Sequence, residues 1–127
     1  KKRSWIMSRI RSKNTSIDIT MRDMLSGMNV RFEMYPDLFG SPDFQVGKRV
    51  LVFCDGDFWH GYRYAEKKRP AKKYWRGKIE GNMRRDRKVS RRLRRDGWSV
   101  LRIWEHDIKK KPEICERKII RKVAERK

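Results

Sequence analysis

Residues 41–55 read SPDFQVGKRVLVFCD, and this stretch decides the fold. Strands are predicted on either side of Gly47-Lys48, over 41–46 and 49–54, because two apolar runs flanking such a pair are typical of a β-hairpin with a two-residue turn. The turn brings the outer ends of the two strands together. We therefore expect the carboxylates of Asp43 and Asp55 to lie side by side.

The other predicted elements surround this hairpin in a chain of 127 residues, which is long enough for one core and too short for two. They are helices over 16–28 and 76–96, strands over 30–35 and 98–104, and a closing helix from Pro112. The order α-β-β-β-α-β-α predicts an α/β fold with a mixed central sheet flanked by helices, in a single domain over 1–127.

The charge of the chain points to a polyanionic partner. Lys and Arg number 36 against 16 Asp and Glu, a formal net charge of +20. Residues 1–13 form a basic N-terminal arm, and residues 67–95 are also strongly basic. Nucleic acid is the leading partner, since phosphate contacts and counterion release drive its binding. A membrane surface is the competing one.

Several simple features indicate the compartment. The sequence has no long apolar segment and no signal-peptide pattern, which predicts a soluble cytoplasmic protein, associated with the nucleoid if it binds DNA. Its two cysteines, Cys54 and Cys115, have neither metal-ligand spacing nor a disulfide framework, as expected in a reducing compartment.

The pair Asp43 and Asp55 is the first candidate for chemistry. Two carboxylates in proximity repel each other unless a cation lies between them, and Mg²⁺ prefers carboxylate oxygens together with water and phosphate. Paired acids in a very basic chain suggest a metal-assisted phosphodiesterase. The alternative is that Asp43 is a turn residue and Asp55 a strand-end cap, and spacing alone does not separate the two interpretations.

Polar residues on the predicted helix over 76–96 add to this site. Ile79, Asn82, Asp86, Val89 and Leu93 form one helical stripe, in which Asn82 and Asp86 interrupt an apolar line. They either face the acidic end of the sheet or fix packing through a helix-to-strand hydrogen bond. His60, just after the second hairpin strand, is a candidate general acid or base, although a lone histidine is often structural.

Aromatic and basic residues are candidates for DNA contact. Phe58 and Trp59 stand between glycines, and Trp75 lies within the alternating run Lys72-Lys73-Tyr74-Trp75-Arg76. Rings of this kind wedge between bases or stack on them beside phosphates, or they simply anchor a loop.

Asp18, three residues after Thr15, is more simply the acid of a helix capping box than a third carboxylate of the metal site.

The motifs together resemble those of the very short patch repair endonucleases, whose fold is restriction-endonuclease-like. The matching segments run in family order across nearly the whole chain: 7–15 (MSRIRSKNT), 41–44 (SPDF), 55–61 (DGDFWHG), 74–75 (YW), 78–79 (KI), 82–86 (NMRRD) and 97–105 (GWSVLRIWE). The resemblance implies a magnesium-dependent endonuclease, with Mn²⁺ as a substitute, that nicks one strand of duplex DNA at or near a T·G mismatch and leaves 5′ phosphate and 3′ hydroxyl ends.

The resemblance also implies roles for single residues. Asp43 matches the metal-binding aspartate, the backbone carbonyl of Cys54 the second protein ligand, and Asp55 a catalytic position that is histidine in some members. His60 matches the catalytic histidine. The polar residues supporting the site are Asn82 and Asp86, and those contacting DNA are the intercalating Phe58, Trp59 and Trp75 together with Lys72, Lys73, Arg76, Arg84 and Arg85.

The chain departs from the family pattern at two places. Asp18 stands where members usually have glutamate. Many members also hold a structural zinc through cysteines at the positions of Asp57 and His106, so no such zinc is expected here, and the loop over 61–66 is expected to be held by packing through Tyr62 and Tyr64.

We expect a monomer that works on mismatched double-stranded DNA, beside mismatch-repair proteins. Two alternatives stay open: a restriction-associated or homing nicking enzyme on the same fold, and a DNA-binding module without activity.

Overall fold

The structure is a computed structural model in which residues 15–58, 60–62 and 73–126 are described. Its elements in chain order are α2 (Ser16–Gly27), β1 (Phe32–Met34), β2 (Phe44–Val46), β3 (Val50–Asp55), α3 (Lys73–Arg95), β4 (Ser99–Trp104), α4 (Glu105–Lys110) and α5 (Pro112–Glu125). The strands form one sheet in the order β1-β2-β3-β4. The first two pairings are antiparallel and β3 pairs with β4 in parallel, so the predicted mixed sheet is confirmed.

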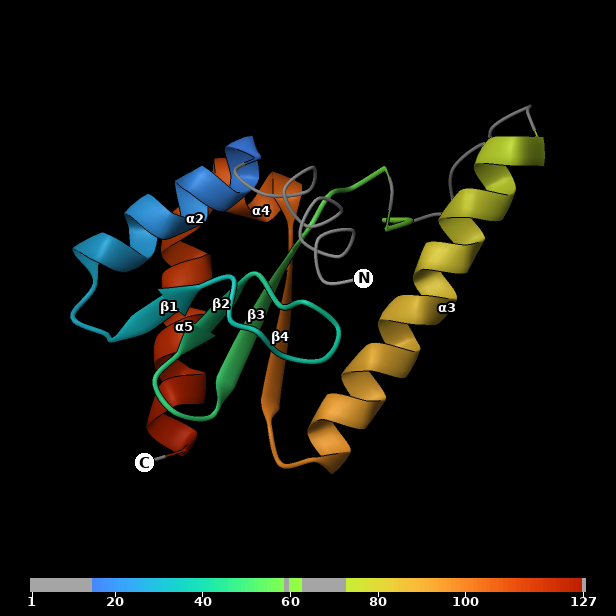
Figure 1. Cartoon of the computed structure of the whole chain (residues 1–127). Coiled ribbons are helices and arrows are strands. Elements are labelled where there is room, and N and C mark those ends of the chain that lie inside the picture. The colour runs from blue at the N-terminus through green and yellow to red at the C-terminus, as the bar shows by residue number, and fades with distance from the viewer. Residues whose placement is uncertain (1–14, 59, 63–72, 127) are drawn as a thin grey trace.

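Helices cover both faces of the sheet (Figure 1). On one face, α2, α4 and α5 pack against a core that includes Phe44, Val52 and Ile103. On the other face, α3 packs through Val89 and Leu93 against a smaller core. Because successive side chains of a strand point to opposite faces, β3 supplies both cores and ends with Cys54 on the α2 side and Asp55 on the α3 side.

The hairpin register differs from the prediction. Val46 pairs with Val50, so the connection has three residues, with Gly47 at φ 63°, and the predicted two-residue turn is wrong. At the other end of β2, Phe44 pairs with Val52, yet the N–H of Asp43 also donates to the Val52 carbonyl at 3.1 Å. Two consecutive residues thus face a single partner, the arrangement of a β-bulge, which bends a strand and re-aims a side chain.

The predicted helices are present with small differences at their ends. The helix expected over 16–28 is α2, and the one expected over 76–96 is α3, which begins three residues earlier. Gly97, at φ 100°, ends α3 in a Schellman motif: its N–H donates to the Arg94 carbonyl, and that of Trp98 to the Leu93 carbonyl. The strand expected over 30–35 is shorter, because Tyr35 turns out of it with φ 55°.

The short helix α4 was not predicted. It follows β4 directly, is six residues long, and buries Ile108 fully. Periodicity over so few residues is too weak a signal to separate a helix from a connection. No helix in the described ranges is long and apolar enough to cross a membrane.

Candidate active site

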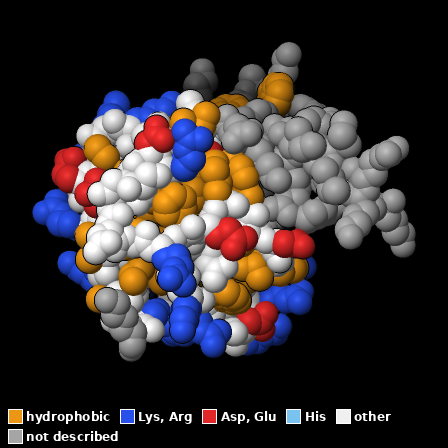
Figure 2. All heavy atoms as spheres, turned by 60° about the vertical axis from the view of Figure 1, so that its left-hand side comes forward, with side chains coloured by type: hydrophobic (Ala, Val, Ile, Leu, Met, Phe, Trp, Pro, Cys, Tyr) orange, Lys and Arg blue, Asp and Glu red, His pale blue; other side chains and the backbone are white. Residues whose placement is uncertain are grey.

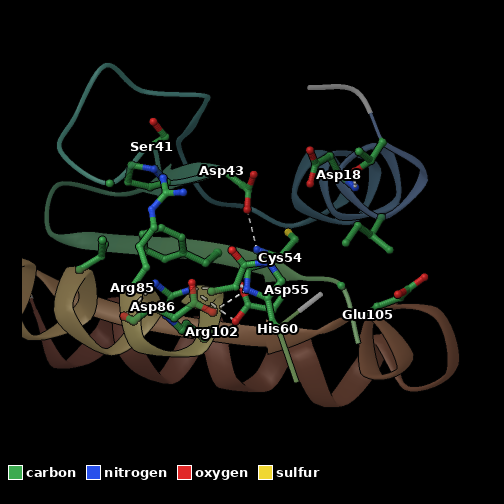
Figure 3. Close-up of a pocket in the computed structure, with 18 of the residues that line it drawn as sticks. Asp18, Ser41, Asp43, Cys54, Asp55, His60, Arg85, Asp86, Arg102 and Glu105 are labelled. Carbon is green, nitrogen blue, oxygen red and sulfur yellow. Dashed lines mark hydrogen bonds and ion pairs between the residues drawn. The ribbon is translucent and has the colours of Figure 1, made fainter. Parts of the chain in front are cut away.

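A cleft of about 810 Å³ opens where β3 ends, between the N-terminal end of α2 and the middle of α3. Strand ends meet there because β2 runs antiparallel to β3, so the start of one lies beside the end of the other. All six residues predicted as catalytic line this cleft, together with Cys54 and Arg85: Asp18, Asp43, Asp55, His60, Asn82 and Asp86. Figure 3 labels all of these except Asn82. The fold therefore brings together residues that are up to 68 positions apart in the sequence.

Asp43 is fixed at the entrance of β2 by its backbone and its side chain. Its carbonyl accepts from the N–H of Tyr35 at 2.7 Å, and its Oδ2 accepts from the N–H of Cys54 at 2.7 Å. Burial raises the pKa of Asp43 to about 7, and the nearby charge of Asp18 adds to the effect, while the Cys54 N–H opposes it. Since burial and a neighbouring acid disfavour the ionised form of Asp43, a cation beside it would stabilise that form.

Asp18 takes part in the cap of α2 and also lines the cleft. Its N–H donates to Oγ1 of Thr15 at 3.4 Å, so Thr15 caps α2 as predicted. The residue is 2% exposed, and its carboxylate accepts a 2.7 Å hydrogen bond from the hydroxyl of Tyr35. Burial raises the pKa of this carboxyl group. It also forms one group with Asp43 and the Cys54 thiol, whose candidate ligand atoms all lie within 4.8 Å of one another.

Asp55, His60 and Asp86 form a second group of the same kind on the α3 side of the cleft. Nδ1 of His60 lies 2.5 Å from Oδ2 of Asp86 and 3.7 Å from Oδ1 of Asp55. Burial disfavours the charged imidazole, but the hydrogen bond to Asp86 and the charges of both acids outweigh it, so the pKa of His60 is raised. Burial also raises the pKa of Asp55, against the opposing charges of His60 and Arg102.

The expected pair of Asp43 and Asp55 is thus distributed over two neighbouring groups. The bulge turns Asp43 toward Asp18 on the α2 side, whereas strand alternation leaves Asp55 on the α3 side. The negative charge of Asp55 nevertheless contributes to the raised pKa of Asp43. They face one cleft from two sides.

Arg102 is a residue of the site that the sequence reasoning missed. It lies on β4 beside Phe53 of β3, and its Nη1 is 3.1 Å from Oδ1 of Asp55. The signal in the sequence was a single arginine inside the apolar run Val100–Trp104, which is the place where a charge needs a buried partner. That signal does not name the partner.

The residues expected to contact DNA, where the structure describes them, lie on the loop after β3 and on α3. Phe58 is 53% exposed, and its ring packs edge-on against Trp75 with centroids 6.5 Å apart. Lys73, Arg76, Arg84 and Arg85 lie on α3, and Arg85 also lines the cleft. Trp59, Lys72 and the arm over 1–13 lie outside the described residues.

Cations also cover other parts of the surface. On the face that Figure 2 shows, Lys and Arg side chains are spread along the edge and within the face, and hydrophobic side chains reach the surface between them. The net charge alone therefore does not single out one side of the molecule, whereas the cations of α3 are gathered on one helix.

The loop after β3 is anchored at the two positions where the family pattern has cysteines. Nδ1 of His106 lies 3.0 Å from Oδ1 of Asp57, a contact between residues 49 positions apart that the sequence did not indicate. Tyr62 packs against the rings of His106 and Trp104, with centroids 4.1 and 5.0 Å apart. Tyr64, the other expected anchor, lies outside the described residues.

Comparison with known proteins agrees with this architecture. A family model described as "DNA mismatch endonuclease Vsr" matches residues 1–66. A type II nicking enzyme, V.NmeDIP, of Neisseria meningitidis serogroup C is 35% identical over 98% of this chain and 87% of its own length. The DNA mismatch endonuclease Vsr of Escherichia coli K12 is 32% identical over 97% of this chain and 81% of its own length.

A further relative, the type II nicking enzyme V.HpaIIP of Haemophilus parainfluenzae, is 32% identical over 91% of this chain and 86% of its own length. These matches extend over almost the whole chain, and they agree with the motifs, the mixed sheet and the acidic cleft. The chain belongs to the Vsr family of very short patch repair endonucleases, with the restriction-endonuclease-like fold of that family.

Proposed function

We propose that this endonuclease is magnesium-dependent and nicks one strand of duplex DNA at or near a base mismatch of the T·G type. One observation carries the proposal: Asp18 and Asp43 face the cleft with no Lys or Arg of the described ranges at ion-pair distance, across from a histidine held by Asp86 (Figure 3). An uncompensated acid pair and a held imidazole are the two parts that metal-assisted hydrolysis needs.

The donor set fits Mg²⁺, or Mn²⁺ in its place. Asp18 and Asp43 offer hard carboxylate oxygens, and the backbone carbonyl of Cys54 is the proposed third protein ligand. The raised pKa of Asp43 supports a cation there, because the positive charge would remove the repulsion from Asp18. When bound, the ion supplies neutralisation of charge on the scissile phosphate.

His60 is the proposed proton-transfer group. Its Nδ1 is held by Asp86, so Nε2 is the atom that exchanges a proton with the attacking water or the leaving oxygen. Asn82, one helical turn before Asp86 on the same cleft wall, is proposed to support this pair. Water adds to phosphorus as the bond from phosphorus to O3′ breaks, which leaves a 5′ phosphate and a 3′ hydroxyl.

Recognition of the weak base pair is assigned to the aromatic residues. The exposed ring of Phe58 packs against the half-buried ring of Trp75 at the start of α3, and we propose that they, with Trp59, wedge beside the mismatch. A mismatched step costs less to unstack than a paired one, which would make the cut selective. Lys72, Lys73, Arg76, Arg84 and Arg85 are proposed to bind the flanking phosphates.

The names of several relatives favour a second candidate, since they are type II nicking enzymes. A restriction-associated enzyme would use the same chemistry but would also cut fully matched duplex DNA. A single domain over 1–127, a monomeric state and a cytoplasmic location remain predictions under either role.

A nicking assay on labelled duplexes tests both candidates. One sequence is prepared fully matched and with each single mismatch, and each is incubated with enzyme and Mg²⁺ or with a chelator. We expect a single-strand cut that needs Mg²⁺ and is fastest with T·G. Equal cutting of matched duplex would favour the restriction-associated role, and no cut on any duplex would refute the proposed activity.

A further inference from the structure

Arg102 connects three elements at the base of the cleft. Its Nε donates to Oγ of Ser90 at 2.7 Å, its Nη1 to Oδ1 and Oδ2 of Asp55 at 3.1 and 3.4 Å, and its Nη2 to the carbonyl of Asp86 at 3.3 Å. The guanidinium also lies over the ring of Phe53, 4.1 Å from its centroid. All three nitrogens are therefore engaged, which fixes the position of the charge.

The guanidinium serves both acids of the second group. Besides Asp55, its Nη1 is 3.5 Å from Oδ1 of Asp86, whose other oxygen holds His60. Its side chain is 20% exposed, so water screens this charge less than that of the other arginines of the site. An arginine stays protonated at every pH that the protein meets.

The two acid groups of the cleft consequently differ in charge. Asp18 and Asp43 have no Lys or Arg among the described residues at ion-pair distance, whereas Asp55 and Asp86 have Arg102 as a fixed counter-charge. By ligand geometry alone, both groups qualify as metal sites. The charge of Arg102 distinguishes the two groups, because its guanidinium would repel a divalent cation placed beside Asp55 and Asp86.

We infer that the guanidinium of Arg102 takes the place that a metal ion would otherwise have beside Asp55 and Asp86. Arg102 thereby confines divalent cations to the side of the cleft that holds Asp18 and Asp43. Asp55 is then no metal ligand in this chain. It is an acid that Arg102 orients toward His60. That cations bind beside Asp18 and Asp43 rests on the proposed function. That Arg102 keeps cations away from Asp55 and Asp86 does not depend on it.

Removing the guanidinium should open a second site. In Arg102→Met the aliphatic length is kept and the charge is lost, so Asp55 and Asp86 lose their permanent counter-charge and keep the imidazole of His60 beside them. A divalent cation can then offset their repulsion. Arg102→Lys keeps a positive charge and should leave the second group closed.

Mn²⁺ binding to the DNA-free protein tests this, with bound and free Mn²⁺ separated by electron paramagnetic resonance. The wild type, Arg102→Met, Arg102→Gln and Arg102→Lys are compared after circular dichroism has shown that each is folded. We expect Arg102→Met and Arg102→Gln to bind one more Mn²⁺ per chain than the wild type, and Arg102→Lys to bind the same number. Equal stoichiometry in the wild type and in whichever neutral variants fold would overturn the inference.

The Asp43→Asn background separates this result from the proposed function. Asp43→Asn should lose the Mn²⁺ that the wild type binds, whereas Asp43→Asn with Arg102→Met should still bind one. If the wild type binds no Mn²⁺ and the Arg102→Met variant binds one, the proposed metal site fails and the role of Arg102 stands. If Arg102→Met binds no more Mn²⁺ than the wild type, and the double variant binds no more than Asp43→Asn, the role of Arg102 fails and the proposed metal site is unaffected.

Discussion

The backbone N–H of Cys54 donates a 2.7 Å hydrogen bond to Oδ2 of Asp43, across the hairpin that joins β2 to β3. This bond holds the carboxylate at the end of β3, where the bulge at Asp43 has already turned it toward Asp18. The acid is therefore positioned by main-chain atoms on both strands. Its place does not depend on a flexible partner side chain.

Asp43→Asn should lower the rate of nicking by about 10³-fold or more, because loss of a metal ligand removes several kcal/mol of charge stabilisation. Affinity for mismatched DNA should change little, since the asparagine keeps the shape of the side chain. Single-turnover nicking and a binding titration in Ca²⁺ measure the two effects. Asp23→Asn, an exposed acid on the outer surface of α2, is the matched control and should cut at the wild-type rate. Wild-type activity in Asp43→Asn would contradict the assignment.

The stability of the metal-free protein should fall as the pH rises from about 4 to about 7. The pKa of Asp43 is about 7 in the folded chain against 3.8 ordinarily, so the folded state binds the proton more tightly. The resulting stabilisation is fully present below the unfolded pKa and is lost as the pH rises through the folded one. Asp18, Asp55 and His60 have raised pKa values and act in the same direction.

Urea unfolding at a series of pH values, with and without Mg²⁺, checks this. Asp43→Asn should flatten the pH dependence, and Mg²⁺ should stabilise the wild type most above pH 7, where the carboxylate is ionised. A free energy of unfolding that rises between pH 4 and 7 would show that the acids of the cleft are not the groups that decide the trend.

His60→Ala should slow single-turnover nicking by about 10²–10⁴-fold, the usual contribution of a general acid or base. Asp86→Asn should act in the same direction with a smaller loss, since the ring remains but its orienting partner is weakened. Because the two side chains work as a unit, the double variant should be little slower than His60→Ala. Strictly multiplicative losses would indicate that Asp86 acts independently of His60.

His106→Ala should destabilise the protein by roughly 1 kcal/mol, since a partly exposed hydrogen bond to Asp57 is lost. It should also weaken binding to mismatched DNA more than to matched DNA, because the anchored loop carries Phe58. His106→Gln, which can still donate to Asp57, should recover much of both. Thermal unfolding and paired binding titrations give the comparison. An equal loss of affinity for both duplexes would assign the loop to phosphate binding.

Gly40→Ala should destabilise the chain by about 1–3 kcal/mol, because an added Cβ would lie 2.4 Å from Cγ1 of Val89 and φ is 81°. Gly97→Ala, with φ of 100° and open space around it, should lose about 1–2 kcal/mol through backbone strain alone. Gly77→Ala, in α3 with open space, should gain about 1 kcal/mol. Urea unfolding ranks the three, and a harmless Gly40→Ala would mean that the loop before Asp43 does not pack on α3 as described.

Much of the fold was predictable because its signals are local. The apolar stripe of Ile79, Val89 and Leu93 on α3, the stop at Gly97 and the proline that opens α5 each follow from a few neighbouring residues. The aspartates at the hairpin ends and the histidine after β3 were found for the same reason. The mixed sheet flanked by helices followed from the alternation of elements along the chain, whereas the order of its strands was not predicted.

Register, bulge and partner choice were decided by tertiary packing. A hairpin loop of two or three residues fits the same sequence, and the observed register is the one that buries Phe44, Val46, Val50 and Val52 on a single face. The bulge at Asp43 then splits the expected acid pair between the two sides of the sheet. Arg102 and His106 found their carboxylates across 47 and 49 residues of sequence, respectively. Such contacts depend on distances in the folded chain, so spacing in the sequence indicates a buried charge without naming its partner.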